Sequence, residues 1–224
     1  MGFNLGNIPG RIPARKQIPG RKSWGFWRIP SKGVEFLSII YTLGHSNHSF
    51  SYFADLLQKY GINLVVDVRS IPYSRPHPQF RKDNLEKCLL SKGLSYCFLG
   101  RELGGKRDEQ SVRTPQGRID YELVRGLSDF QRGLEYLEGQ LSQWKIPALV
   151  CAEKDPLRCH RFFLITPALL KKEWPVKHIL ADGETISHEE GEEIFLKQKT
   201  KPSLFTPAEE VLKNAYRWGR MGNF

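Results

Sequence analysis

Two cysteines and a histidine carry the sharpest chemical signal in the sequence. Cys151 ends an apolar run that predicts a buried strand, and Cys159 and His160 begin the helix predicted to follow it. The first turn of a helix presents free backbone N–H groups and a partial positive charge, which favour a thiolate and can bind an anion. A thiolate next to a proton-transferring side chain is a typical enzyme nucleophile. This segment is therefore the first candidate for a reaction centre.

Polar residues follow three other predicted strands in the same way. Ligands of an open α/β sheet bind beyond the carboxyl ends of its strands, so these side chains are expected at one edge. The candidates for catalysis are Cys151, Cys159, His160, His45, Glu153 and Asp67. The candidates for substrate binding are Arg69, Arg75, Arg161, Ser46, Gly104 and Gly105. The candidates for contacts to nucleic-acid phosphates are Arg101, Lys106 and Arg107. In this scheme the arginines hold an anionic group, and His45 or Glu153 moves protons.

The same cysteines and histidines are also side chains that bind zinc. Four ligands could come from Cys151, Cys159, His160 and His45. Against this reading, the C-x7-C-H spacing is not a familiar zinc pattern, and ligands adjacent in the chain strain a tetrahedral site. A transient disulfide between Cys151 and Cys159 is a further alternative. The leading interpretation therefore has no cofactor, with zinc as its alternative, whereas Cys88 and Cys97 are expected in the core.

The spacing of apolar residues predicts the elements that position these side chains. Short apolar runs predict strands over residues 38–43, 62–68, 94–99, 146–152 and 176–180. Helical spacing predicts helices over residues 50–60, 82–91, 121–143 and 159–172, and two more that begin at Ser187 and Thr206. Buried strands separated by helices indicate a mostly parallel sheet. The expected fold is a three-layer, Rossmann-like α/β domain with about five strands flanked by helices.

Charge and composition predict how the 224 residues are organised. Residues 1–37 hold seven basic residues and one acidic residue, so six of the ten net positive charges lie there. This segment is rich in proline and glycine, and we expect a disordered basic arm that could also lie on nucleic acid. Residues 38–182 are expected to form the α/β domain, and residues 183–224 a helical extension. The remaining residues carry a net charge of +4, which favours an anionic partner.

The composition argues against several classes of protein. The longest apolar runs are far shorter than the roughly 20 residues that span a bilayer, so no membrane association is expected. Four cysteines in a chain of this length do not suggest a disulfide framework. We therefore expect a cytoplasmic protein, with an oligomeric state that the sequence does not reveal.

Five segments together resemble a known family. They are Y-T-L-G-H-S-N at Tyr41–Asn47, V-V-D-V-R-S-I-P-Y-S-R at Val65–Arg75, P-Q-F at Pro78–Phe80, L-G-R-E-L-G-G at Leu99–Gly105 and C-A-E-K-D-P-L-R-C-H-R at Cys151–Arg161. In this order they resemble the domain-of-unknown-function 488 family over about residues 38–182. The resemblance implies a bacterial or archaeal cytosolic α/β domain with its site in these motifs. It does not imply a particular reaction, although members are sometimes labelled as DNA-repair proteins.

Three functions remain open from the sequence. The leading hypothesis is an enzyme, a hydrolase or a transferase, that binds a phosphorylated small molecule, a nucleotide-like compound or nucleic acid at the carboxyl edge of the sheet. The first alternative is a nucleic-acid-binding module without catalysis, linked to DNA repair. The second is a zinc site or a thiol-redox site. The enzyme leads because clustered titratable groups at this edge are the usual arrangement for catalysis.

Overall fold

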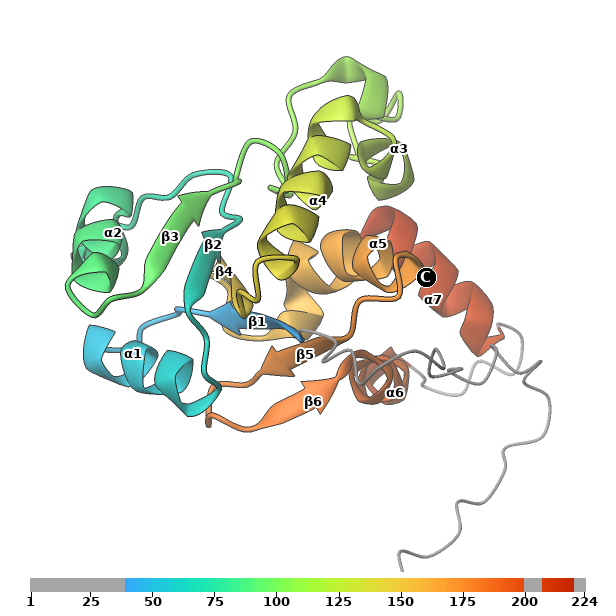
Figure 1. The fold of residues 1–224 in the computed structure, drawn as a ribbon. Helices are drawn as coiled ribbons and strands as arrows, with labels where there is room; N and C mark the ends of the chain where they lie inside the picture. The colour runs from blue at the N-terminus through green and yellow to red at the C-terminus, as the bar shows by residue number, and fades with distance from the viewer. Residues whose placement is uncertain (1–38, 200–206, 220–224) are drawn as a thin grey trace, which may run out of the picture. The chain divides into compact units, whose positions relative to one another are not determined.

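A six-stranded sheet forms the centre of the protein in the computed structural model, which describes residues 39–199 and 207–219 (Figure 1). The strands lie in the order β3-β2-β4-β1-β5-β6. Their bounds are β1 Ile40–Gly44, β2 Leu64–Asp67, β3 Ser95–Phe98, β4 Pro147–Cys151, β5 Val176–Ile179 and β6 Thr185–Ser187. The first five are parallel to their neighbours and β6 is antiparallel to β5. The prediction of a mostly parallel sheet is thereby confirmed.

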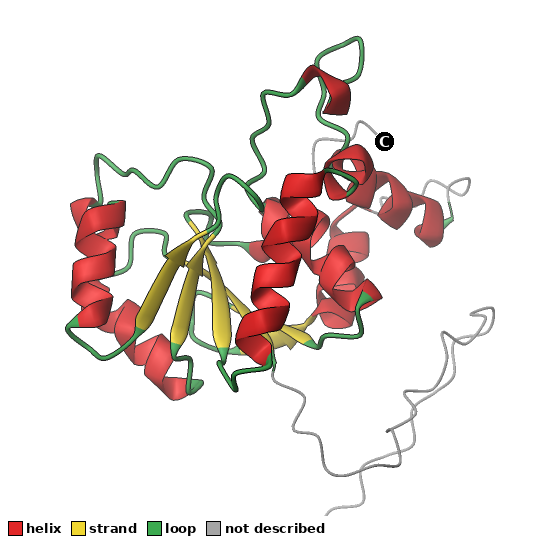
Figure 2. Ribbon diagram, turned by 45° about the horizontal axis from the view of Figure 1, so that its top comes forward, coloured by secondary structure: helices red, strands yellow, loops and turns green. Residues whose placement is uncertain are grey.

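Helices cover both faces of this sheet (Figure 2). Their bounds are α1 Phe50–Lys59, α2 Lys82–Leu90, α3 Tyr121–Arg125, α4 Ser128–Leu141, α5 Thr166–Lys171, α6 His188–Lys199 and α7 Ala208–Trp218. Within the described ranges, none of the helices is both long and apolar enough to cross a bilayer. The predicted arm of residues 1–37 lies outside the residues that the structure describes, as does Thr206, the predicted cap of the last helix.

The period of two along the strands divides the core between the two faces. Val65 and Val150 point toward α1 and α2, whereas Val66 and Leu149 point toward α4 and α5, and all four are fully buried. A third apolar cluster joins the segment after β4 to α6 and α7, with Phe163 among its members. The three-layer α/β fold expected from the sequence is present, and the C-terminal helices share a core with it.

The order of elements differs from the prediction in three places. The segment 121–143 is mostly helical as predicted, but it contains two helices, because the backbone of Leu127 is extended and separates α3 from α4. The strand β6 was not predicted, since three residues give too short an alternation to recognise. The helix expected at Ser187 is confirmed together with its capping box, in which Ser187 and Glu190 each accept the other's backbone N–H.

A third difference lies in the helix expected over residues 159–172. It starts with a π-helical turn, Arg161–Ile165, before α5 begins. Pro167 has no N–H, so an α-helical bond to the carbonyl of Phe163 cannot form. Arg125 on α3 donates to that carbonyl instead, at 3.2 Å. Such π turns inside helices occur often at functional sites, and this one begins two residues after Cys159.

Candidate functional site

Cys151, Cys159 and His160 lie together at the carboxyl end of β4. Nδ1 of His160 lies 3.6 Å from Sγ of Cys159 and 3.9 Å from Sγ of Cys151. The three potential ligand atoms all lie within 4.8 Å of one another. Both cysteines are buried and neither forms a disulfide, while His160 is half-buried. The structure thus brings together three residues that the sequence singled out, and we call them the Cys/His cluster.

A tight connection after β4 places Cys159. The side chain of Asp155 accepts the N–H of Leu157, which opens a 3₁₀ turn over Pro156–Arg158. The N–H of Cys159 then donates to the carbonyl of Pro156 at 3.0 Å, and its own backbone is extended. The expectation of a free helical N–H at Cys159 therefore fails, because this group is already bonded within the turn. The environment of its sulfur comes from side chains.

The ring of His160 has a fixed orientation. Its Nε2 lies 3.1 Å from the carbonyl oxygen of Val68, which can only accept, so Nε2 carries a hydrogen. In the neutral ring the lone pair of Nδ1 then faces the two sulfurs. A Cβ on Gly105 would come within 2.8 Å of Cβ of His160. Gly105, predicted to bind substrate, therefore provides the space in which this ring lies.

Arg161 points into the protein and not toward solvent. It is fully buried, and its Nε donates to Sγ of Cys159 at 3.2 Å. Its Nη2 donates to the carbonyl of Glu153 at 2.7 Å and its Nη1 to Oγ1 of Thr42 at 3.4 Å. All three guanidinium nitrogens thus have internal acceptors. This placement does not fit the predicted role as a substrate ligand, and Arg161 instead contacts the cluster itself.

The two cysteines are electrostatically unequal. Burial opposes ionisation of Cys159, but the hydrogen bond from Cys151 and the charge of Arg161 outweigh it and lower the pKa of Cys159 well below its ordinary value. The same hydrogen bond and burial raise the pKa of Cys151 well above its ordinary value. The surroundings therefore favour ionisation of Cys159 over ionisation of Cys151.

Asp67 and Arg69 form a second, separate cluster beside the first. The carboxylate of Asp67 accepts from Nε and Nη2 of Arg69 at 2.8 and 2.6 Å, and from the hydroxyl of Tyr96 at 2.9 Å. Nη1 of Arg69 donates to the carbonyl of Phe80 at 2.7 Å. Both charged side chains are buried, so they neutralise each other and hold the loop after β2. Their placement does not fit catalysis by Asp67 or anion binding by Arg69.

His45 belongs to this second cluster. Its Nδ1 lies 3.0 Å from the carbonyl oxygen of Ser46, and its Nε2 lies 3.0 Å from Nη1 of Arg69. The ring also stacks on Phe80 with the centroids 4.3 Å apart. Burial and the charge of Arg69 lower the pKa of His45 to about 4. With both nitrogens engaged, His45 is not available as the fourth zinc ligand that the sequence suggested.

The remaining predicted residues divide by exposure. Arg107 is buried and donates to the carbonyls of Arg101 and Glu102, so its guanidinium does not face solvent. Gly104 is needed for packing, since a Cβ there would come within 2.2 Å of the carbonyl oxygen of Gly100. Ser46 is half-buried with a φ of 45°. The predicted residues that are exposed are Arg75, Arg101, Lys106 and Glu153.

One exposed cation, Lys154, was missing from the predicted site. It lies on the loop after β4 with the exposed Arg158, next to the Cys/His cluster in the chain. Thr42 was also missed, although a hydroxyl inside the apolar strand β1 is a signal that could have found it. It is fully buried and receives Nη1 of Arg161.

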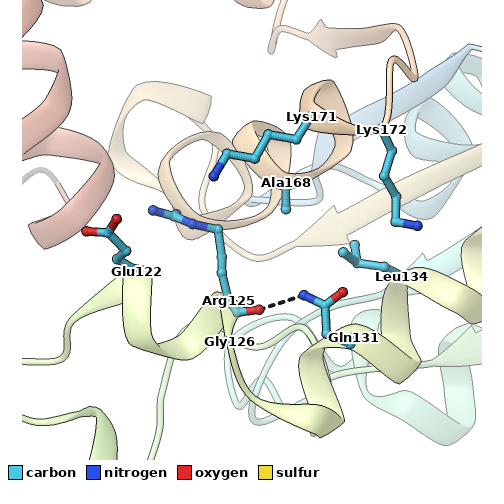
Figure 3. A pocket seen from close by; sticks show the side chains of 8 residues that line it. All are labelled: Glu122, Arg125, Gly126, Gln131, Leu134, Ala168, Lys171 and Lys172. Atoms are coloured by element: carbon cyan, nitrogen blue, oxygen red, sulfur yellow. Dashed lines mark hydrogen bonds between the residues drawn. The ribbon is translucent and has the colours of Figure 1, made fainter.

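A hollow of about 330 Å³ lies elsewhere, between α3 and α4 on one side and α5 on the other (Figure 3). Figure 3 shows the side chains of Glu122, Arg125 and Lys171 around it, and the amide of Gln131 bonded to the carbonyl of Arg125. None of the residues that line it is a predicted site residue. This hollow therefore gives no support to the predicted site.

Fold and site together define a mostly parallel α/β protein with a cysteine–histidine cluster at the carboxyl edge of its sheet. The family model described as Domain of unknown function DUF488 matches residues 49–166, more than half of the chain, and the chain belongs to this family. The match includes the segment Cys151–Arg161, whereas the motif Tyr41–Asn47 precedes it. No curated protein and no solved structure matched the chain.

Proposed function

We propose that the protein is a zinc-dependent hydrolase that acts on a phosphate-bearing nucleotide or nucleic acid. The observation that carries this proposal is the geometry of Cys151, Cys159 and His160. Zinc bonds of about 2.3 Å to sulfur and 2.0–2.1 Å to nitrogen, at tetrahedral angles, separate these ligand atoms by about 3.5 Å. The sulfur-to-nitrogen distances of 3.6 and 3.9 Å are close to this value.

The surroundings of the cluster suit a metal centre. The second nitrogen of His160 is held by the carbonyl of Val68, and a carbonyl in this position is the usual partner of a histidine ligand. The guanidinium of Arg161 contacts the sulfur of Cys159, which favours its thiolate form. These contacts are typical of the outer shell that orients the ligands of a metal.

Three protein ligands are the number found in catalytic zinc sites, which keep a fourth position for water. A zinc ion lowers the pKa of its bound water to near neutrality and so supplies a hydroxide nucleophile. Glu153 follows Cys151 by two residues and its side chain is exposed. We assign to its carboxylate the transfer of protons between this water and the leaving group.

Exposed cations support a phosphate-bearing substrate. Arg75 follows β2, Arg101 and Lys106 follow β3, and Lys154 and Arg158 follow β4, and all five are exposed. The loop over residues 68–81 contains no aspartate or glutamate. Because these loops leave the same edge of the sheet as the cluster, their cations can bind phosphates near it.

The zinc content of the purified protein tests whether the Cys/His cluster binds zinc. We expect about one zinc per chain in the wild type and in the control variants C88S and C97S, which change the two cysteines outside the cluster. We expect loss of zinc in C151S and in C159S. Equal zinc content in all four variants would contradict the assignment of the ligands.

A panel of substrates tests whether the protein hydrolyses a nucleotide or a nucleic acid. Nucleotides and short single-stranded and double-stranded oligonucleotides are incubated with the zinc-loaded protein, and products are identified by mass spectrometry. We expect hydrolysis of at least one class, its loss in E153Q and its loss after chelation with recovery on adding zinc. Binding without turnover of any member would support the nucleic-acid-binding alternative and overturn the hydrolase.

A further inference from the structure

A chain of side-chain hydrogen bonds, buried as far as His188 and partly buried beyond it, continues from Arg161 to Glu192 on α6. Nη1 of Arg161 lies 3.4 Å from Oγ1 of Thr42, which lies 2.8 Å from Nδ1 of His178 on β5. Nε2 of His178 lies 3.1 Å from Nδ1 of His188 on α6. Nε2 of His188 lies 2.8 Å from the hydroxyl of Tyr216 on α7, which donates to the carboxylate of Glu192.

Only one pattern of donors satisfies this chain. The hydroxyl of Tyr216 gives its hydrogen to Glu192, so its oxygen accepts from Nε2–H of His188. A neutral His188 then accepts at Nδ1 from Nε2–H of His178. His178 in turn accepts at Nδ1 from the hydroxyl of Thr42, whose oxygen accepts from Arg161. Every donor therefore points from Arg161 toward Glu192.

Both histidines are neutral in this arrangement. Burial lowers the pKa of His188 to about 3, and burial together with the neighbouring His188 and Arg161 lowers the pKa of His178 well below its ordinary value. Three of the side chains, Thr42, His178 and His188, are almost completely buried. Buried polar groups that lose a partner are costly, so each link constrains the next.

The far end of the chain lies in the C-terminal helices. His188 and Glu192 are on α6 and Tyr216 is on α7, and both helices follow the residues 49–166 that match the family model. The near end, Arg161, contacts the sulfur of Cys159. The hydrogen bonds thus join a segment outside the matched residues to the Cys/His cluster.

We infer that His188 and Tyr216 are positioning residues, which hold Arg161 against Cys159 through Thr42 and His178. The C-terminal helices α6 and α7 thereby support the cluster indirectly, from outside the residues that match the family model. The inference rests on the hydrogen-bond chain, and it uses the proposed zinc function for only one of its two readouts.

Tyr216→Phe tests this inference, because it keeps the ring and removes only the hydroxyl that links His188 to Glu192. The matched control is Tyr52→Phe, which removes a hydroxyl that donates to the carbonyl of Ala181 and has no link to Arg161. The first readout is nitrogen NMR of the histidine rings and of Arg161 Nε–H. In the wild type we expect hydrogen on Nε2 of His178 and His188.

In Tyr216→Phe we expect the resonances of His188, His178 and Arg161 Nε–H to shift, and in Tyr52→Phe we expect them to stay in place. The second readout is the rate of zinc release to a chelator. We expect release about fivefold faster in Tyr216→Phe, the factor that corresponds to one hydrogen bond of ordinary strength. Tyr52→Phe should release zinc at the wild-type rate.

An unchanged Arg161 resonance in Tyr216→Phe, or an equal shift in the control, would overturn the inference. The two proposals fail separately. If the wild type holds no zinc, the proposed function is wrong, and the NMR readout still decides the positioning role. If zinc is bound but both variants release it at the wild-type rate with unshifted resonances, the positioning role is wrong and the zinc site stands.

Discussion

Arg161 is completely buried and donates Nε–H to the sulfur of Cys159 over 3.2 Å. A guanidinium in this position needs a negative partner, because burying an uncompensated charge is costly. Among the hydrogen-bond partners of Arg161, the thiol of Cys159 is the group that can take a negative charge, and the cation is one cause of its lowered pKa. This contact explains why the arginine that follows Cys159 and His160 in the chain is buried and not at the surface.

Replacing Arg161 by methionine should destabilise the protein by about 3 kcal/mol, since the thiolate of Cys159 and the carbonyl of Glu153 lose their buried donor. Urea unfolding measures this change. Arg158→Met serves as the control, because Arg158 is exposed and should change the free energy of unfolding by less than about 0.5 kcal/mol. Equal effects of the two variants would contradict the structural role of Arg161.

Asp67→Asn should also destabilise strongly, by about 3–5 kcal/mol, because Arg69 would remain buried without a counter-charge. The exposed Asp55 on α1 provides the matched control, and Asp55→Asn should have an effect near zero. Both are measured by denaturant unfolding at neutral pH. A small effect of Asp67→Asn would show that the fold does not need this carboxylate. The predicted catalytic role of Asp67 would then be open again.

Stability should fall as the pH drops from 7 to 5. His45 and His188 have pKa values of about 4 and about 3 in the folded protein, both below the unfolded value of 6.5. Between these values the unfolded chain binds protons that the folded protein does not, so acid favours unfolding. Each histidine should cost about 2 kcal/mol over this interval. His188→Gln should reduce the pH dependence, and an unchanged dependence would show that His188 is already protonated in the folded protein.

Charge reversal at Arg75 and Lys106 should weaken binding of a single-stranded oligonucleotide to the zinc-loaded protein. Each lost phosphate contact should also reduce the slope of log affinity against log salt by about one. Lys171→Glu changes an exposed lysine beside the separate hollow, and we expect little effect from it. Fluorescence anisotropy at several salt concentrations measures both quantities. An equal loss in the control would indicate binding to net charge alone.

The sequence predicted the sheet well because its strands are continuous apolar runs between helices with clear ends. The capping box formed by Ser187 and Glu190 also made the start of α6 predictable. By contrast, the break between α3 and α4 depends on one extended residue, Leu127, and the π-helical turn depends on Pro167 together with a donor from Arg125 far away in the chain. Such tertiary contacts leave no local pattern.

The difference between local sequence patterns and tertiary contacts applies to the candidate site as well. The meeting of Cys151, Cys159 and His160 follows from their places at a strand end and in the turn after it. The direction of a side chain is a different matter, since sequence alone cannot tell an arginine that binds a substrate from one that binds the protein. Arg69, Arg161 and Arg107 all turned inward because buried acceptors were available to them.

X-ray absorption at the zinc edge of the purified protein tests the central claim most directly. The account predicts a zinc ion with two sulfur neighbours at about 2.3 Å and two nitrogen or oxygen neighbours at about 2.0–2.1 Å. One nitrogen would come from His160, and the remaining neighbour would be water. Zinc without sulfur neighbours, or protein that holds no zinc after growth with the metal, would contradict the account.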